Sequence, residues 1–422
     1  MSVFWVAALS AYALFSAAIL LFACVDPDGE GVLSTLSRGL YEVPDALVSS
    51  GLARAVLGTR GQRILRRCGH YVCEEPNPIL QTVYLALVCG GYGAVILVAY
   101  PRVPCATLGA YHEWTGLVAF AAALFSFCLA SRAPPGYIVD AATEKRHDNY
   151  PYDDVLFTSG RACPTTGVRK LARSKFCRTT GLTVARFDHF CPWINQAVGE
   201  ENYRYFLLFL GLHVILLTYG AAACTLLLWD VVVTERLAQA LFFDARLGRT
   251  VPATKIVILR YLLGKEKVLT ALLAVCLVMG VLVVAFLAYH LWLISRGTTT
   301  NEYYKWRAIK NAKNITNIYN RGLLANIGEV LFPLSTRSPT ERPPPDAWLR
   351  RRQTPQEEDD DDGGADVAAT TTKRQQRRGS FPRSPSNNNN NNRHHHNGGG
   401  APHHHESSSP SEKTTTTKPK QS

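Results

Sequence analysis

Five long apolar runs restrict this chain more than any other feature of its sequence. A helix that crosses a hydrocarbon core about 30 Å thick needs roughly 20 mainly apolar residues. Runs of about this length occur at Val3–Cys24, Leu80–Tyr100, Trp114–Ala130, Phe206–Trp229 and Val268–Ile294. We therefore predict an all-α polytopic membrane protein with about five transmembrane helices and a small, loop-rich domain between the third and fourth helices.

The first run has two readings. A secretory signal peptide would begin with a basic stretch and would have an apolar core of about 7 to 15 residues. Val3–Cys24 lacks the basic start and is longer than such a core. We interpret it as a retained N-terminal anchor.

Basic residues in the loops predict the orientation, because loops that stay in the cytosol carry an excess of Lys and Arg. Such residues are frequent before the second run and between the third and fourth runs, which places the N-terminus outside and the C-terminal tail in the cytosol. The loop between the fourth and fifth runs disagrees, because it is basic although predicted to be lumenal. It is long enough for the charge rule to weaken, and we expect Val251–Leu263 to lie along the membrane surface.

The formal charge of +12 does not indicate nucleic-acid binding, because the basic residues gather beside the spans and in the tail, where anionic lipid attracts them. Several of the eleven cysteines lie inside the predicted spans, so they do not form a disulfide framework.

Three residues in the segment between the third and fourth runs suit nucleophilic chemistry. Asp188, His189 and Cys191 fall within four positions. A neighbouring imidazole can hold a thiol as thiolate at neutral pH, and a carboxylate can fix the tautomer of that imidazole. By themselves, three such residues are a weak signal.

The surrounding residues strengthen this signal. The sequence 188–195 reads Asp-His-Phe-Cys-Pro-Trp-Ile-Asn, and Asn202–Phe206 and a predicted span follow it. This pattern resembles the DHHC protein S-acyltransferase (palmitoyltransferase) family. Three further stretches are similar to elements of the same family and stand in the family order: Pro134-Pro135-Gly136, with Pro134 in place of an Asp; Thr299-Thr300-Asn301-Glu302; and Tyr319-Asn320-Arg321-Gly322 with Asn326 and Phe332.

The resemblance implies an enzyme that moves a palmitoyl or other long acyl group from acyl-CoA to protein cysteines. Cys191 would be the acylated nucleophile, His189 the base and Asp188 its orienter. Thr299, Thr300, Glu302 and Asn326 would be structural supports. The expected partners are acyl-CoA, membrane-associated proteins with cytosolic cysteines and the lipid bilayer. Basic residues that could meet the CoA phosphates are Arg169, Lys170, Arg173, Lys175 and Arg204.

One departure from the family concerns metal. Members of the family hold two zinc ions through eight Cys and His ligands, but only Cys163 and Cys177 stand at matching positions here. The other six positions are occupied by Thr166, Phe176, Thr180, Thr183, Phe190 and Ala197. The two thiols belong to different sites of the pattern, so neither site can close, and we predict that zinc is absent and that no other cofactor is permanently bound.

Composition predicts the domain boundaries. Residues beyond 335 include Pro, acidic, Asn, His and Thr runs that cannot form a core, so a disordered tail is expected there. The predicted parts are an N-terminal anchor (1–24), a cytosolic loop (25–79), two spans (80–131), the cytosolic catalytic domain (132–203), two spans with a lumenal loop (204–296), an ordered C-terminal region (297–334) and the tail (335–422).

Two alternatives to an active transferase remain open. The loss of zinc ligands also fits a weak or inactive pseudoenzyme that acts as a membrane scaffold. His213 and His290, inside predicted spans, are the only features that suggest transport, and histidines satisfied within the bundle are a simpler account. For the membrane of residence, the resemblance favours the endoplasmic reticulum, with the Golgi as the alternative. A glycosylation acceptor sequence, Asn314-Ile315-Thr316, lies in the part predicted to be cytosolic and offers a test of the orientation.

Overall fold

The computed structural model describes residues 51–244, 248–309, 316–344 and 347–348. Within these ranges, four helices are long and apolar enough to cross a membrane: Ile79–Arg102, Tyr111–Arg132, Tyr203–Thr234 and Lys267–Ser295. They contain the second to fifth predicted runs and extend each of them at both ends. The predicted first span and the glycosylation residue Asn314 lie outside the described residues.

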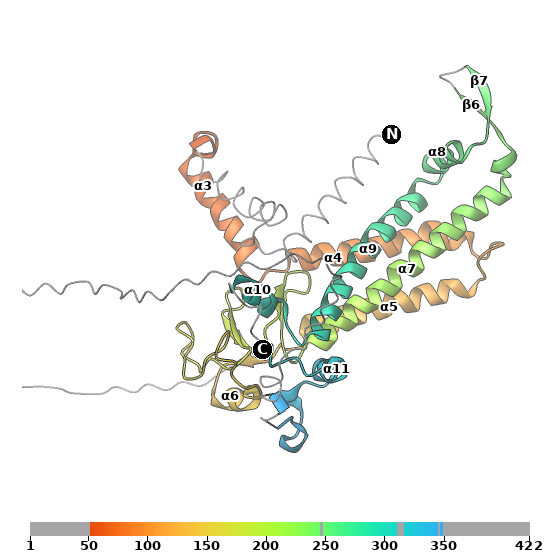
Figure 1. Cartoon of the computed structure of the whole chain (residues 1–422). Helices are drawn as coiled ribbons and strands as arrows, with labels where there is room; N and C mark the ends of the chain where they lie inside the picture. The colour runs from red at the N-terminus through yellow and green to blue at the C-terminus, as the bar shows by residue number, and fades with distance from the viewer. Residues whose placement is uncertain (1–50, 245–247, 310–315, 345–346, 349–422) are drawn as a thin grey trace, which may run out of the picture. The chain divides into compact units, whose positions relative to one another are not determined.

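The four apolar helices pack mainly through α7 (Tyr203–Thr234), which lies against both α5 (Tyr111–Arg132) and α9 (Lys267–Ser295) (Figure 1). The remaining helix begins as α4 (Ile79–Ala94) and continues through a short π-helix, η1 (Val95–Ala99), and a 3-10 helix, η2 (Tyr100–Arg102). Stacked rings join it to α5: Tyr84 and Phe127 have centroids 4.3 Å apart, and Tyr92 and Phe120 have centroids 4.0 Å apart.

His213, on α7, is satisfied inside this bundle. Its Nδ1 donates to the carbonyl oxygen of Phe209 at 2.7 Å, and its Nε2 then accepts from the Tyr84 hydroxyl at 2.7 Å. A neutral ring with both nitrogens bonded agrees with the simpler of the two accounts of this histidine.

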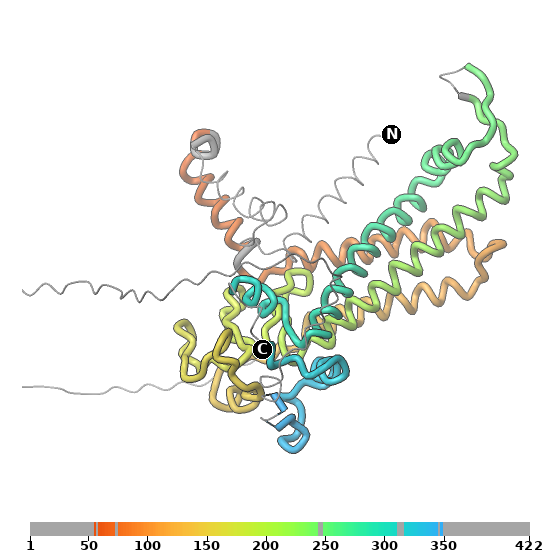
Figure 2. The backbone as a smooth tube through the Cα atoms, viewed as in Figure 1, coloured from red at the N-terminus to blue at the C-terminus, as the bar shows by residue number. Residues whose placement is uncertain are grey.

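The segment between α5 and α7 leaves the helix bundle and returns to it, as Figure 2 traces. It holds a three-stranded sheet of order β1-β3-β2 and a separate hairpin, β4–β5, with all pairs antiparallel. The predicted loop-rich domain therefore contains short strands. Its elements are β1 (Tyr137–Ile138), α6 (Ala141–His147), β2 (Lys175–Cys177), β3 (Leu182–Val184), β4 (His189–Cys191) and β5 (Gln196–Val198).

The connection between α7 and α9 contains η3 (Leu237–Gln239), the hairpin β6 (Leu241–Asp244) and β7 (Arg249–Pro252), and helix α8 (Lys255–Lys265). Part of the segment predicted to lie on the membrane surface is thus helical. Ile256, Leu259 and Leu263 share one face of α8 and are 50% to 60% exposed, as a surface-lying helix requires, although its place at the membrane stays a prediction.

The region after α9 contains α10 (Thr300–Ala308), α11 (Leu323–Leu331), η5 (Leu334–Thr336) and η6 (Pro339–Glu341). Order continues beyond the predicted boundary at 335. Trp348 is only 1% exposed because it packs edge-on against Tyr150 and lies under the guanidinium of Arg321. The predicted boundary at 335 is therefore wrong, because composition does not show that Trp348 packs against aromatic residues far away in the sequence. The tail from 349 lies outside the described residues.

A buried ionic network joins the segment between α5 and α7 to the region after α9. The Arg173 side chain is completely buried, and its Nε and Nη2 donate to the two carboxylate oxygens of Glu302 at 2.7 Å each. Its Nη1 donates to Glu329 at 3.0 Å, and Glu329 also forms ion pairs with Arg186 and Arg321, each at 3.1 Å. Burial opposes ionisation of Glu329, but the three arginines hold its pKa below the usual range.

We expect Arg173→Met to destabilise the fold strongly, because it leaves the Glu302 carboxylate buried without its bidentate partner. Loss of one partner from a buried pair costs about 3 to 5 kcal/mol. Arg169→Met is the matched control, because the Arg169 side chain is 43% exposed in its ion pair with Asp148 and should contribute no more than about 1 kcal/mol. Thermal unfolding of the purified proteins in detergent measures both, and equal losses would contradict this account.

Candidate active site

Strand β4 places the predicted base and nucleophile on one side of a hairpin. Successive side chains of a strand point to opposite faces, so His189 and Cys191 share a face and Phe190 points the other way. In the register, Phe190 lies opposite Ala197 and Cys191 lies opposite Gln196. Cys191 is 5% exposed and packs in an apolar cluster with residues of all four long helices, among them Phe127 and Phe206.

Asp188 is held at the N-terminus of α10. Its Oδ1 accepts from the Thr300 backbone N–H at 2.8 Å, and its Oδ2 accepts from the Thr300 hydroxyl at 2.9 Å. Thr299 caps the helix: its hydroxyl accepts from Glu302 N–H, and the Glu302 carboxylate accepts from Thr299 N–H. The predicted support motif is therefore a capping box whose second threonine binds the carboxylate.

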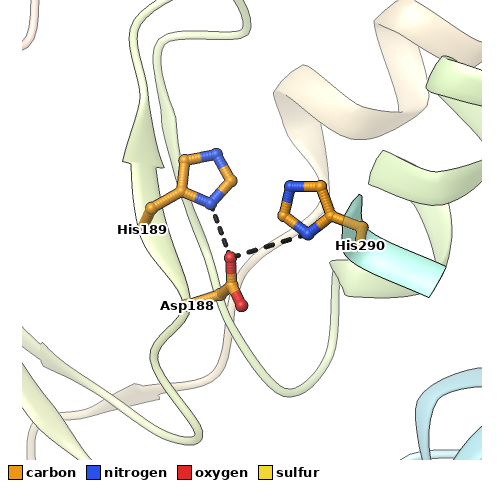
Figure 3. Close-up of side chains that lie close together, drawn as sticks. All are labelled: Asp188, His189 and His290. Carbon is orange, nitrogen blue, oxygen red and sulfur yellow. Dashed lines mark hydrogen bonds and ion pairs between the residues drawn. The ribbon is translucent and has the colours of Figure 1, made fainter. Parts of the chain in front are cut away.

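His189 completes the arrangement. Its Nδ1 lies 2.7 Å from Asp188 Oδ2 (Figure 3), which places the ring's other nitrogen, Nε2, away from the carboxylate. Burial opposes the charged ring, but the hydrogen bond to Asp188 and the nearby Cys191 thiol raise the pKa of His189 to about 10. Burial also opposes ionisation of Asp188, yet His189, His290 and Thr300 hold its pKa well below the usual range. The site therefore favours a negatively charged Asp188 beside a positively charged His189.

A second imidazole lies beside this pair. His290, on α9, is fully buried, and its Nδ1 is 4.0 Å from Asp188 Oδ2 and 2.8 Å from the Tyr203 hydroxyl. The sequence showed a histidine inside a span but gave no sign of this neighbourhood, because the contact joins residues about a hundred positions apart. Within the described ranges, Asp188, His189 and His290 are the only group of acidic, His or Cys side chains close enough to share a metal ion. The short hydrogen bond from His189 to Asp188 favours a dyad instead.

Comparison with known proteins agrees with this geometry. A sequence profile described as DHHC palmitoyltransferase matches residues 156–307, which include Asp188, His189, Cys191 and the capping box. Over this segment the chain is similar to the DHHC palmitoyltransferase family.

Named relatives support the assignment. The chain is 31% identical over 229 residues to "Palmitoyltransferase ZDHHC4" of Mus musculus, an alignment that covers 50% of this chain and 65% of the relative. It is 33% identical over 207 residues to "Palmitoyltransferase SWF1" of Yarrowia lipolytica, covering 48% of this chain and 51% of the relative. The Bos taurus ZDHHC4 aligns over 95% of its length at 26% identity. The first of these alignments spans just under two thirds of the relative.

The positions where DHHC proteins carry zinc ligands form two separate clusters here. In one, the Thr166 and Thr183 hydroxyls are 3.4 Å apart. Burial opposes ionisation of Cys163, but hydrogen bonds from Thr166, Thr165 and Thr183 lower the pKa of the Cys163 thiol to about 7.

The other cluster is apolar. Cys177 packs with Phe187, Ala197 and half-buried Phe190, and Phe190 and Ala197 are direct cross-strand partners. Each cluster thus offers one sulfur, whereas a structural zinc takes four Cys, His or carboxylate ligands. The residues present do not fit a zinc ion at either place.

The residues predicted to meet CoA phosphates are scattered. Arg173 is wrong for this role, because its buried guanidinium is taken by Glu302 and Glu329. Arg169 pairs with Asp148, and Arg204 donates to the Leu331 carbonyl oxygen at 3.2 Å.

Lys170 and Lys175 remain, and Lys305, which the sequence did not single out, joins them. Burial, and after it the charges of Lys175 and Lys170, lower the pKa of Lys305 to about 8.

The raised pKa of His189 predicts a pH-dependent stability. An unfolded His releases its proton near pH 6.5, whereas the folded site holds it to about pH 10. The stabilisation is therefore complete below about pH 6.5 and is lost as the pH rises to about 10. In thermal unfolding in detergent at stepped pH, the advantage of wild type over His189→Gln should shrink across this window. An advantage that stays constant would refute the assigned protonation.

Proposed function

We propose that this chain is a protein S-acyltransferase that moves a palmitoyl or similar long acyl group from acyl-CoA to cysteine thiols of other proteins. The observation that carries the proposal is the aligned set of Thr300, Asp188, His189 and Cys191, in which each group orients the next. Such an ordered chain of donor, carboxylate, imidazole and thiol is the arrangement that activates a cysteine nucleophile.

The residues suggest the steps. His189 is the base that receives the Cys191 proton and, because its pKa is raised to about 10, it keeps that proton as an imidazolium beside the thiolate; Asp188 orients and stabilises this imidazolium. The Cys191 thiolate displaces CoA from its thioester, and His189 returns the proton to the departing thiolate. A protein thiol then attacks acyl-Cys191 in the same way. Each step exchanges one thioester for another, so the free energy is nearly balanced and no ATP is required.

The surroundings of Cys191 suit a long acyl chain. The thiol lies in a cluster with Tyr84 of α4, Phe127 of α5, Phe206 of α7 and Ile294 of α9, so it faces the apolar helices. Each buried CH₂ of an acyl chain contributes about 0.8 kcal/mol. A chain seated among these helices would bring its thioester to the end of the bundle where β4 lies.

The cluster of Lys170, Lys175 and Lys305 is the best candidate for the phosphates of CoA. The pKa of Lys305 is lowered first by burial and then by the charge of Lys175, and a bound polyanion would offset that positive charge. We place this cluster, the catalytic segment and its protein substrates on the cytosolic side, in the membrane of the endoplasmic reticulum.

Labelling of cells with an alkyne-tagged palmitate tests the proposed function. Wild type should carry label that neutral hydroxylamine removes, because a thioester is cleaved by it, and Cys191→Ser should carry none. Cys224→Ser is the matched control: Cys224 is buried within α7, away from the catalytic hairpin, and its loss should leave the label intact. Equal label in wild type and Cys191→Ser, or none in either while another family member labels in parallel, would indicate a pseudoenzyme scaffold.

We further propose that the fold needs no zinc. Purified protein should contain well below one zinc per chain by elemental analysis. A strong chelator should leave its unfolding temperature unchanged, because the one-sulfur clusters at Cys163 and Cys177 cannot retain the ion. A family member with all eight ligands, treated in parallel, should lose stability. Stoichiometric zinc in this chain, or chelator sensitivity equal to that of the control, would refute the proposal.

A further inference from the structure

Two imidazole nitrogens at the active site have no hydrogen-bond partner among the described residues. They are Nε2 of His189 and Nε2 of His290, and both atoms are buried. His189 Nδ1 is hydrogen-bonded to Asp188 Oδ2, and His290 Nδ1 faces the same oxygen at 4.0 Å, so both Nε2 atoms point away from the carboxylate and to the same side (Figure 3). A buried polar atom without a partner is costly, so two such atoms in rings whose centroids are 5.6 Å apart suggest a ligand that bonds to them in the working enzyme.

The protonation of His290 follows from its neighbours. Tyr203 is 1% exposed. Among the described residues, the only acceptor that its hydroxyl meets is His290 Nδ1, at 2.8 Å. The phenol satisfies its proton by donating to Nδ1. Asp188 Oδ2, at 4.0 Å, is beyond hydrogen-bond reach of that nitrogen and already receives Thr300 and His189. A neutral ring whose Nδ1 accepts must carry its proton on Nε2.

The two free nitrogens therefore differ in role. His189 Nε2 is on the side of the Cys191 thiol, whose proximity contributes to the raised pKa of His189, and it exchanges a proton with sulfur. His290 Nε2 is a fixed N–H donor with nothing to donate to. The ring is held by Tyr203 and by edge contacts with Phe206 and Phe286, at centroid distances of 5.1 Å and 4.7 Å.

We propose that His290 Nε2–H binds the carbonyl oxygen of the acyl thioester and stabilises the oxyanion formed on it, an inference that rests on the proposed transferase function. When the Cys191 thiolate attacks the carbonyl carbon, a new C–S bond forms and the carbonyl π pair moves to oxygen. His290 donates to that oxygen. The pair then reforms C=O as the C–S bond to CoA breaks, and the CoA thiolate takes the proton from His189.

A comparison of acylation with alkylation at Cys191 separates this role from others. Attack on an acyl thioester passes through an oxyanion, whereas alkylation of the same thiolate by iodoacetamide does not. His290→Phe removes the donor but keeps a ring in place. Purified protein should then form acyl-Cys191 from palmitoyl-CoA on the order of 100-fold more slowly, with an unchanged KM for palmitoyl-CoA. The rate of iodoacetamide modification at Cys191, followed by peptide mass spectrometry, should stay close to that of wild type.

His189→Gln is the contrasting variant, because it should slow acylation and alkylation together. His290→Gln, whose amide offers an N–H near the position of imidazole Nε2, should recover much of the acylation rate that His290→Leu loses, and this pair decides the matter if His290→Phe does not fold. Parallel loss of both reactions in His290→Phe, or equal rates in the Gln and Leu variants, would overturn the proposal. Absence of acyl-Cys191 in wild type would instead refute the transferase function itself.

Discussion

The N-terminus of α10 is the constraint on which the rest of the active site depends. Three sets of interactions meet there. Thr299 and Glu302 close the helix end on each other, Thr300 fixes both oxygens of Asp188, and Glu302 also receives the buried guanidinium of Arg173. Helix N-termini attract carboxylates because their first N–H groups lack partners. A single helix end therefore locks the catalytic carboxylate, the end of α9 and the strand segment into one arrangement.

This arrangement supports a segment that lacks most of the zinc ligands expected from the family resemblance. Two tight turns follow Cys163 and Cys177: Gly167 N–H donates to the Cys163 carbonyl oxygen at 2.8 Å, and Gly181 N–H donates to that of Cys177 at 2.9 Å. Both glycines have positive φ, 72° and 69°, which other residues rarely adopt. A hydrogen bond and a positive-φ glycine thus define the shape of each turn. Arg173, with bonds to Glu302, Glu329 and the Gly297 carbonyl oxygen, ties the same segment to α10 and α11.

The sequence predicted those parts of the molecule that local pattern determines. Apolar length predicted four of the described helices to within a few residues, and motif resemblance predicted Asp188, His189, Cys191 and the threonines that hold them. It could not predict contacts between distant segments. Arg173 looked like a phosphate ligand because its sequence neighbours are basic, and His290 looked like any histidine in a span. Trp348 lay in a tail whose composition indicated disorder. In each case the residue's role depends on a contact with a residue far away in the sequence, and local sequence patterns do not reveal such contacts.

The alternation of side chains along β4 places the proposed catalytic residues on one face and a position expected to hold a zinc ligand on the other. His189 and Cys191 face Asp188 and the apolar helices, whereas Phe190 faces the cluster of Cys177 and Ala197. The former ligand pairs are also cross-strand neighbours, Phe190 with Ala197 and Phe176 with Thr183, so each pair could change together without moving the backbone. Because one strand separates the two faces, replacement of ligands on one side need not displace the nucleophile on the other. The absence of zinc ligands is therefore weak grounds for inferring an inactive site.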